Sequence, residues 1–302
     1  MPRGRPSCQP FRAEDEQVLP NSRYILRAAA PDAIGILADV AGYIARAGLN
    51  VIESQDFGDS DTARFFIWVE FESPDGFDRA TFEAGFNALA EKRSMTWSLR
   101  RKADRPRALI MVSKGDHCLN DLLYRHRRGQ LGAEITAIVS NHEDGRWLAE
   151  RHELPYHYVP VTRDTKLEAE DRLRQLIRET QSDFVVLARY MQVLSDGLCR
   201  ELEGRCINIH HSFLPSFKGA KPYHQAHKRG VKLIGASAHY VTADLDEGPI
   251  IAQDVSPVDH RLTPQRMAEI GRDIEARVLS RAVTAHAEGR VFLNGIRTVV
   301  FE

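Results

Sequence analysis

Residues 206–254 read CINIHHSFLPSFKGAKPYHQAHKRGVKLIGASAHYVTADLDEGPIIAQD, and the rest of the chain is organised around them. The short apolar run at 206–210 is typical of the end of a buried strand. Because side chains alternate between the two faces of a strand, Asn208 and His210 are expected to project to the same side. The run therefore predicts an amide and an imidazole close together at the end of a strand.

The remainder of this stretch supplies a carboxylate. A loop and a short helix near 223–229 precede a second alternating run at 233–241, which contains His239. The turn that follows contains Asp246, with Asp244 as a rival, because a turn carboxylate often only bonds its own backbone. An amide, an imidazole and a carboxylate that meet at strand ends can polarise a carbonyl group and move protons.

Two motifs of this stretch, NIHHSFLP at 208–215 and LDEGPIIAQD at 245–254, resemble those of formyltransferase-type enzymes that handle 10-formyltetrahydrofolate. With GAKPYHQA and LIGASAHYV between them, the chain is most similar to the formyltetrahydrofolate deformylase family. The resemblance implies hydrolysis of 10-formyltetrahydrofolate to formate and tetrahydrofolate, with the folate as substrate and no permanently bound cofactor. It places the catalytic residues on Asn208, His210 and Asp246. It also implies formate supply for purine synthesis and balance of the folate pool.

The segment ARYMQVL at 188–194 resembles the folate-binding loop of that family. Its apolar side chains would sandwich a flat pterin ring while backbone groups contact the ring edge. The alternative is an ordinary turn from a strand into a helix. The predicted substrate-binding residues are Arg189, Tyr190, Met191, Val193, Leu194, His211, His239 and Gly248.

Length and composition restrict the class of protein. At 302 residues two domains are expected, and a net charge of −1 gives no electrostatic argument for binding nucleic acid or a membrane surface. Four cysteines without CxxC spacing favour reduced thiols and a cytoplasmic protein. No run approaches the roughly 20 apolar residues that span a bilayer. Residues 1–20 lack the apolar core of a secretory signal, and we expect a flexible arm there.

Residues 21–101 show the order strand, helix, strand, strand, helix, strand, which predicts a ferredoxin-like βαββαβ domain. The segment PDAIGILADVAGYIARAGLNV at 31–51 resembles an ACT regulatory domain. That resemblance implies pairing into a homo-oligomer and an amino-acid effector near the loop after the first strand. The usual Asp-Arg-x-Gly is Asp32-Ala33-Ile34-Gly35 here, so a purely dimerising role is the alternative. The basic run at 100–107 predicts a solvated linker, with its bounds at 102–107.

Residues 108–302 alternate apolar strands with helices, which predicts a doubly wound, mostly parallel α/β domain. In such sheets the site lies at the carboxyl ends of the strands, where the run at 206–210 places Asn208 and His210. Apolar residues three or four apart at 267–282 predict a helix. The segment 291–301 predicts a hairpin around Asn294-Gly295.

Five histidines between 210 and 239 also invite a zinc-binding interpretation. Adjacent residues of a strand face opposite ways, so His210 and His211 are not expected to bind one ion together. The chain has no HExxH motif, and HELPYH at 152–157 has the wrong spacing and a helix-breaking proline. We therefore expect no metal site, with His211 and His239 lining the pocket instead.

The segment KGDH at 114–117 bears on which reaction is catalysed. Related glycinamide ribonucleotide formyltransferases usually have a Gly-Ser-Asn phosphate-binding loop here, whereas Asp116 would repel a phosphate. A hydrolase is therefore favoured over an enzyme that passes the formyl group to glycinamide ribonucleotide, and the near-neutral net charge of −1 argues against a charged tRNA as the acceptor. A third hypothesis, an amino-acid-sensing protein with an inactive site, is disfavoured by the intact Asn208, His210 and Asp246.

Overall fold

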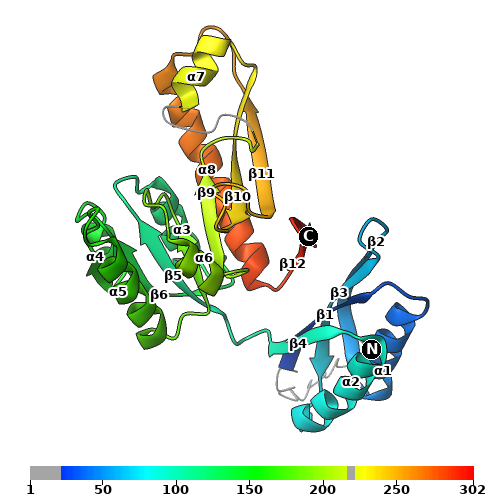
Figure 1. The fold of residues 1–302 in the computed structure, drawn as a ribbon. Coiled ribbons are helices and arrows are strands. Elements are labelled where there is room, and N and C mark those ends of the chain that lie inside the picture. Colours follow the sequence, from blue (N-terminus) through cyan, green and yellow to red (C-terminus); the bar gives the residue numbers. More distant parts are fainter. Residues whose placement is uncertain (1–21, 216–221) are drawn as a thin grey trace, which may run out of the picture.

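A computed structural model of the protein describes residues 22–215 and 222–302. Two sheets form an N-terminal domain (22–101) and a C-terminal domain (from 107 on), and the end of the chain lies between them (Figure 1). The arm predicted for residues 1–20 lies outside the described residues.

The N-terminal domain has the predicted ferredoxin-like order. Its antiparallel sheet has the strand order β2-β3-β1-β4, and two helices cover one face (Figure 1). The elements are β1 (Ser22–Pro31), α1 (Ile36–Arg46), β2 (Asn50–Asp59), β3 (Arg64–Ser73), α2 (Arg79–Arg93) and β4 (Thr96–Arg101).

Local sequence explains where these two helices begin. Helix α1 follows Gly35, whose φ of 89° lies in the left-handed region that glycine adopts without strain. Helix α2 follows Asp78, whose side chain accepts a hydrogen bond from the backbone N–H of Thr81. The buried side chains of α1 recur every fourth residue and therefore face the sheet: Ile36, Val40 and Ile44.

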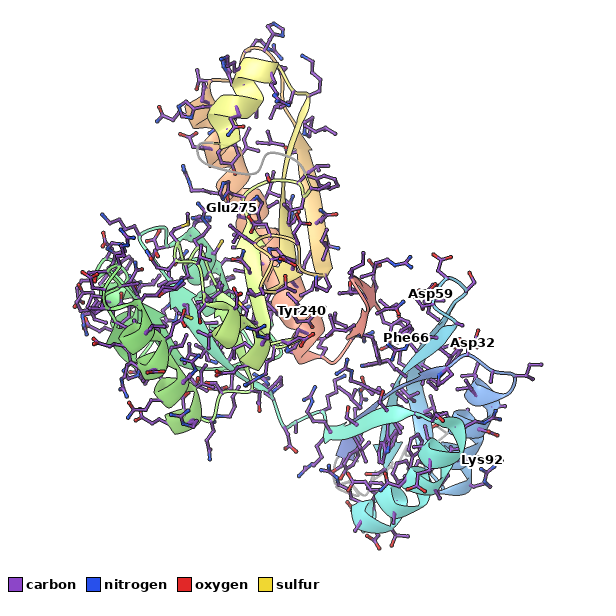
Figure 2. All side chains as sticks on the ribbon, in the orientation of Figure 1. Asp32, Asp59, Phe66, Lys92, Tyr240 and Glu275 are labelled. Atoms are coloured by element: carbon purple, nitrogen blue, oxygen red, sulfur yellow. The ribbon has the colours of Figure 1, made fainter. Side chains whose placement is uncertain are left out.

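The other face of the N-terminal sheet is covered by the C-terminal hairpin. Strands β12 (Val291–Asn294) and β13 (Arg297–Val300) pair around the predicted turn. Phe66 of β3 meets Phe292 of β12 edge to face, with 5.7 Å between ring centroids. Asn294 donates a buried hydrogen bond to Asp59, and both Asp59 and Phe66 lie on the side of the sheet that faces the hairpin (Figure 2). The last residues of the chain therefore stabilise its first domain.

The basic run at 100–107 makes contacts within the N-terminal domain as well as between the domains. Lys102 Nζ pairs with the buried Glu70 at 2.6 Å, and Arg100 Nη2 donates to the carbonyl oxygen of Ala287 at 2.8 Å. Ala287 ends α8, where a cation is favourable because the helix carbonyls point outward. The prediction that 100–107 is simply solvated is therefore wrong for Arg100, which the neighbouring domain partly buries.

The C-terminal domain is built on a seven-stranded sheet with the order β11-β10-β9-β8-β5-β6-β7. The strands from β9 to β7 run parallel, whereas β10 and β11 are antiparallel additions beside β9, which confirms a mostly parallel sheet. Its strands are β5 (Arg107–Val112), β6 (Glu134–Ser140), β7 (Tyr156–Tyr158), β8 (Phe184–Leu187), β9 (Cys206–His210), β10 (Leu233–Tyr240) and β11 (Ile250–Pro257). The sequence pattern did not predict β11 as a strand.

Helices cover both faces of this sheet, as a doubly wound fold requires. Helices α3 and α8 contribute to the core on one face, and α5 and α6 to the core on the other. The helices are α3 (His117–Arg127), α4 (Arg146–Arg151), α5 (Lys166–Glu179), α6 (Asp196–Glu201), α7 (Pro222–Arg229) and α8 (Pro264–Ala287). The six-residue α6 was not predicted, because so short a helix shows little periodicity. Strand β9 lies between β8 and β10, so its carboxyl end is enclosed by both neighbours.

Candidate active site

The site lies at the carboxyl end of β9, where β10 pairs with it. Asn208 pairs in register with His239, and His210 with Ser237. A pocket of about 250 Å³ opens here, lined by the loop after β8, the end of β9 and the turn after β10. The structure therefore brings Asn208, His210 and Asp246 together as lining residues of one pocket.

His210 and Asp246 form the polar centre of the pocket, with 3.2 Å between Nδ1 and Oδ2. The hydrogen bond from His210, with a smaller effect of the nearby His239, outweighs burial and holds the pKa of Asp246 well below its usual range. Asp246 is therefore a carboxylate at neutral pH and accepts the Nδ1–H of His210. In the neutral ring Nε2 is then the unprotonated nitrogen. This atom is buried and has no hydrogen-bond partner among the described residues.

His239 orients Asn208. Nδ1 of His239 lies 2.8 Å from the carbonyl oxygen of Tyr240, which can only accept, so Nδ1 carries the proton. In the neutral ring Nε2 is an acceptor, and Nδ2 of Asn208 lies 3.3 Å from it. Nε2 also lies 3.7 Å from Asp246 Oδ1, an ion pair only when His239 is protonated. One amide N–H of Asn208 is thereby used, which leaves the second for a molecule in the pocket.

The turn after β10 has a constrained shape. Asp246 has a φ of 58°, in the left-handed region that residues other than glycine rarely adopt. A Cβ atom on Gly248 would lie 1.7 Å from the carbonyl oxygen of Tyr240, so only glycine fits there. Gly248 was predicted to bind the substrate. In the structure it shapes the turn and is not among the residues that line the pocket. The rival Asp244 is exposed and also does not line the pocket.

The two neighbouring histidines do not face opposite ways. The rings of His210 and His211 are stacked, with centroids 4.9 Å apart and an angle of 17° between their planes. The prediction of opposite faces is wrong because β9 ends at His210, so strand alternation does not extend to the next residue. Both rings line the pocket, as does His239.

The loop after β8 supplies the apolar wall of the pocket. Met191 and Val193 are 59% and 57% exposed. Two contacts anchor the loop, since Ser113 Oγ accepts the backbone N–H of Met191 at 2.9 Å and Glu170 accepts that of Ser195 at 2.7 Å. Five predicted substrate-binding residues of this loop line the pocket: Arg189, Tyr190, Met191, Val193 and Leu194.

Glu275 of α8 and His117 of α3 are candidate residues that the sequence reasoning missed. Glu275 is 2% exposed, and its carboxylate lies 2.8 Å from Nε2 of His117. The available signal was a carboxylate inside the apolar stripe of the last predicted helix. With Cys118, these residues form the one group in the described part of the chain that is close enough to hold a metal ion.

The chemistry of this group does not favour a cation. The guanidinium of Arg189 lies 3.3 Å from the Glu275 carboxylate and already supplies a positive charge. Burial raises the pKa of the Cys118 thiol well above its ordinary value, so the thiolate that binds metals is disfavoured.

Comparisons with known proteins bear on the family. Residues 106–283 match the family model described as formyl transferase. A formyltetrahydrofolate deformylase of Corynebacterium sp. (strain P-1) is 50% identical over 281 residues, which are 92% of this chain and 98% of that protein. The chain belongs to the formyltetrahydrofolate deformylase family.

Solved structures separate this family from its transferase relatives. A formyltetrahydrofolate deformylase from Pseudomonas putida KT2440 is 51% identical with a TM-score of 0.88, and the match covers 92% of this chain and 100% of that one. A glycinamide ribonucleotide transformylase from Symbiobacterium toebii is 27% identical with a TM-score of 0.62, and the match covers 68% of this chain and 98% of that one. Both the predicted family and the predicted α/β fold class are confirmed. In the described residues, none of the helices is long and apolar enough to cross a membrane.

Proposed function

We propose that this member of the family hydrolyses 10-formyltetrahydrofolate to formate and tetrahydrofolate. The observation that carries the proposal is the convergence of Asn208, His210 and Asp246 in one pocket with an apolar wall. A relative that carries the deformylase name and is 50% identical over 281 residues, 92% of this chain, supports it. The folate is the substrate in this proposal, and no step needs a permanently bound cofactor.

His210 moves the proton of the attacking water. Asp246 keeps a proton on Nδ1 of His210, so Nε2 is the basic nitrogen. As the water oxygen bonds to the formyl carbon, Nε2 accepts one water proton, and the resulting imidazolium lies 3.2 Å from the Asp246 carboxylate. That contact stabilises the charge which develops on the ring.

Asn208 stabilises the negative charge that develops on the formyl oxygen. The formyl oxygen becomes an oxyanion when water adds, and the free amide N–H of Asn208 donates to it. One such donor typically lowers the barrier by about 3–4 kcal/mol. The proton held by His210 then passes to N10 of the folate, the C–N bond breaks, and formic acid leaves and ionises to formate.

The loop after β8 binds the pterin ring. Its apolar side chains line the pocket together with Asn208 and His210, and its anchors at Ser113 and Glu170 hold the loop in place. Such a lining recognises a flat heterocycle through apolar contact, while a few polar groups set its orientation.

Hydrolysis is favoured over formyl transfer because the loop after β5 is a poor phosphate site. Glycine-rich loops bind phosphate by presenting backbone N–H groups at a helix N-terminus. Here Asp116 immediately precedes α3 and is exposed, so its negative charge lies where an acceptor phosphate would bind. Lys114 offsets part of this repulsion.

One assay tests the proposal. Purified protein with 10-formyltetrahydrofolate and no acceptor is expected to release one formate for each folate consumed. Added glycinamide ribonucleotide should neither change that rate nor become formylated. Transfer of a labelled formyl group to this acceptor, at a rate equal to or above hydrolysis, would overturn the proposal.

The finer physiological assignments are also proposals. Formate for purine synthesis is the use that fits the reaction, and a cytoplasmic location fits the free, buried thiols of Cys118, Cys199 and Cys206. An association of N-terminal domains into a homo-oligomer would cover the edge strands β2 and β4. Light scattering should give a particle mass of at least twice the 34.1 kDa of one chain, and a single-chain mass would contradict this.

The ACT-like domain has two candidate roles. An amino-acid effector would bind near the loop at 32–35, where Ile34 is 99% exposed and the segment itself contains no arginine. The alternative is a role in association alone. Formate release measured with and without individual amino acids decides between them, since an effector changes the rate and a purely associating domain does not.

A further inference from the structure

A buried carboxylate lies behind the pocket and joins four separate segments of the C-terminal domain. Glu275 of α8 lies inside the domain (Figure 2). Its Oε2 lies 2.8 Å from Nε2 of His117 on α3 and 3.3 Å from Nε of Arg189 in the loop after β8. Its Oε1 accepts from the hydroxyl of Tyr223 on α7 at 2.9 Å. A buried charge with three polar partners is costly to assemble, so its position needs an explanation.

The surrounding backbone is adapted to this arrangement. A Cβ atom on Gly271, one helical turn before Glu275, would lie 1.9 Å from the Tyr223 hydroxyl, so glycine makes room for the tyrosine. Arg189 has a φ of 65°, a left-handed conformation that an arginine rarely adopts. Burial opposes ionisation of Glu275, but the hydrogen bond from His117 and the charge of Arg189 lower its pKa on balance.

Arg189 carries the effect of Glu275 to the pocket. Its Nη1 lies 2.7 Å from Nδ1 of His211. A guanidinium can only donate, so Nδ1 of His211 must be the acceptor, and the proton of the neutral ring is on Nε2. Burial and then the charge of Arg189 lower the pKa of His211 to about 4, which keeps the ring neutral. Nε2 of His211 is buried without a hydrogen-bond partner in the described residues.

We propose that Glu275 is a positioning residue that, through Arg189, fixes His211 as a neutral Nε2–H donor for the substrate. The inference rests on the proposed hydrolysis and adds a donor and its support to the site. The two stacked rings then differ in role, because Nε2 of His210 accepts a proton while Nε2 of His211 donates a hydrogen bond.

A neutral His211 matters because its neighbour must become charged. The rings of His210 and His211 are 4.9 Å apart, so a second imidazolium would oppose protonation of His210. The charged and titratable groups that act on His211 are Arg189, His210, Glu275 and Asp246. Arg189 raises the positive charge near the pair, and Glu275 compensates for it, which leaves Asp246 to stabilise the imidazolium of His210.

The test compares Glu275→Gln with a matched control. Glutamine keeps the shape and the acceptor for Tyr223 but removes the charge that holds Arg189. Glu70→Gln is the control, because Glu70 is also 2% exposed and ion-paired, with Lys102 and Arg23, but lies in the N-terminal domain. Both variants should lose thermal stability, whereas only Glu275→Gln should lose turnover.

The expected effect on turnover follows from misplacement of the donor. A shift of about 1 Å in a reacting group can cost about a hundredfold in rate. We expect kcat for formate release to fall at least about tenfold in Glu275→Gln, and kcat/KM to fall by at least that factor, because the donor contacts the bound substrate as well as the transition state. Glu275→Asp, which keeps the charge, should recover part of this loss.

Histidine ¹⁵N NMR reads the tautomer directly and does not depend on turnover. The His211 signal is assigned by its absence from the spectrum of His211→Asn. In the wild-type protein it should show a proton on Nε2 alone down to about pH 5, because the pKa of His211 is about 4. In Glu275→Gln this signal should shift toward exchange between tautomers, while Glu70→Gln leaves it unchanged. A wild-type His211 with its proton on Nδ1, or a kcat in Glu275→Gln equal to that of Glu70→Gln, would overturn the proposal. A wild type that releases no formate would instead overturn the proposed hydrolysis, and the NMR signal would still decide the tautomer.

Discussion

Replacing Asp246 by asparagine removes the charge on which the proposed proton transfer depends. The amide keeps the shape of the carboxylate but no longer stabilises an imidazolium at His210. At an effective dielectric constant near 20, opposite charges 3.2 Å apart attract each other by about 5 kcal/mol, with each 1.36 kcal/mol equal to about a tenfold change in rate. Part of this attraction is replaced by the amide dipole. We therefore expect kcat to fall by roughly a hundredfold to ten-thousandfold.

The assay measures formate release and folate binding on the same samples. Binding of tetrahydrofolate should stay within about threefold of wild type, because the apolar wall of the pocket is untouched by the substitution. Asp244→Asn is the matched control, since this carboxylate is in the same turn, is exposed and does not line the pocket. Its activity should equal that of wild type.

Three results would refute this reasoning. Turnover of Asp246→Asn within about tenfold of wild type would show that the carboxylate is not needed. A large loss in Asp244→Asn would move the role to that residue. Equal loss of folate binding and turnover in Asp246→Asn would indicate that the effect comes from a changed shape of the turn and not from the lost charge.

Three further substitutions test the turn at the site, the C-terminal hairpin and a buried histidine. Gly248→Ala should lower both the melting temperature and formate release, because the new Cβ would lie 1.7 Å from the carbonyl oxygen of Tyr240, and unchanged values would contradict the packing of this turn. Phe292→Ala should reduce the free energy of unfolding by about 3–5 kcal/mol in urea titrations. Leu293 is 39% exposed on the same strand, so Leu293→Ala should reduce it much less. Similar losses in the two variants would argue against the hairpin contact. Burial lowers the pKa of His286 from 6.5 to about 4, so the unfolded chain binds a proton that the folded protein does not. The free energy of unfolding is therefore unaffected by His286 above pH 6.5, and it falls by up to about 3 kcal/mol as the pH is lowered to 4. His286→Leu should flatten the pH dependence of stability in that window.

The sequence by itself determined the fold class and most of the candidate site. Local periodicity reports which residues a segment buries, so it predicted both sheets, the long last helix and the terminal hairpin. The motifs around Asn208, His210 and Asp246 are long and ordered, and they placed three polar side chains that the structure brings into one pocket. Gly248 belongs to the same motif, but its role is to let the backbone pass close to Tyr240. The motif alone does not show which of its residues contact the substrate and which shape the turn.

Contacts between distant segments were decided by the tertiary structure alone. Glu275 and His117 are separated by 158 positions, and nothing in either neighbourhood indicates that they meet. The stacking of His210 and His211 depends on where β9 ends, which is set by its pairing with β10. The hairpin covers the N-terminal sheet because both faces of that sheet are apolar, yet periodicity shows only that a face is buried and not which segment buries it. The identity of the partner is a property of the assembled fold, because it depends on geometry that no single segment specifies.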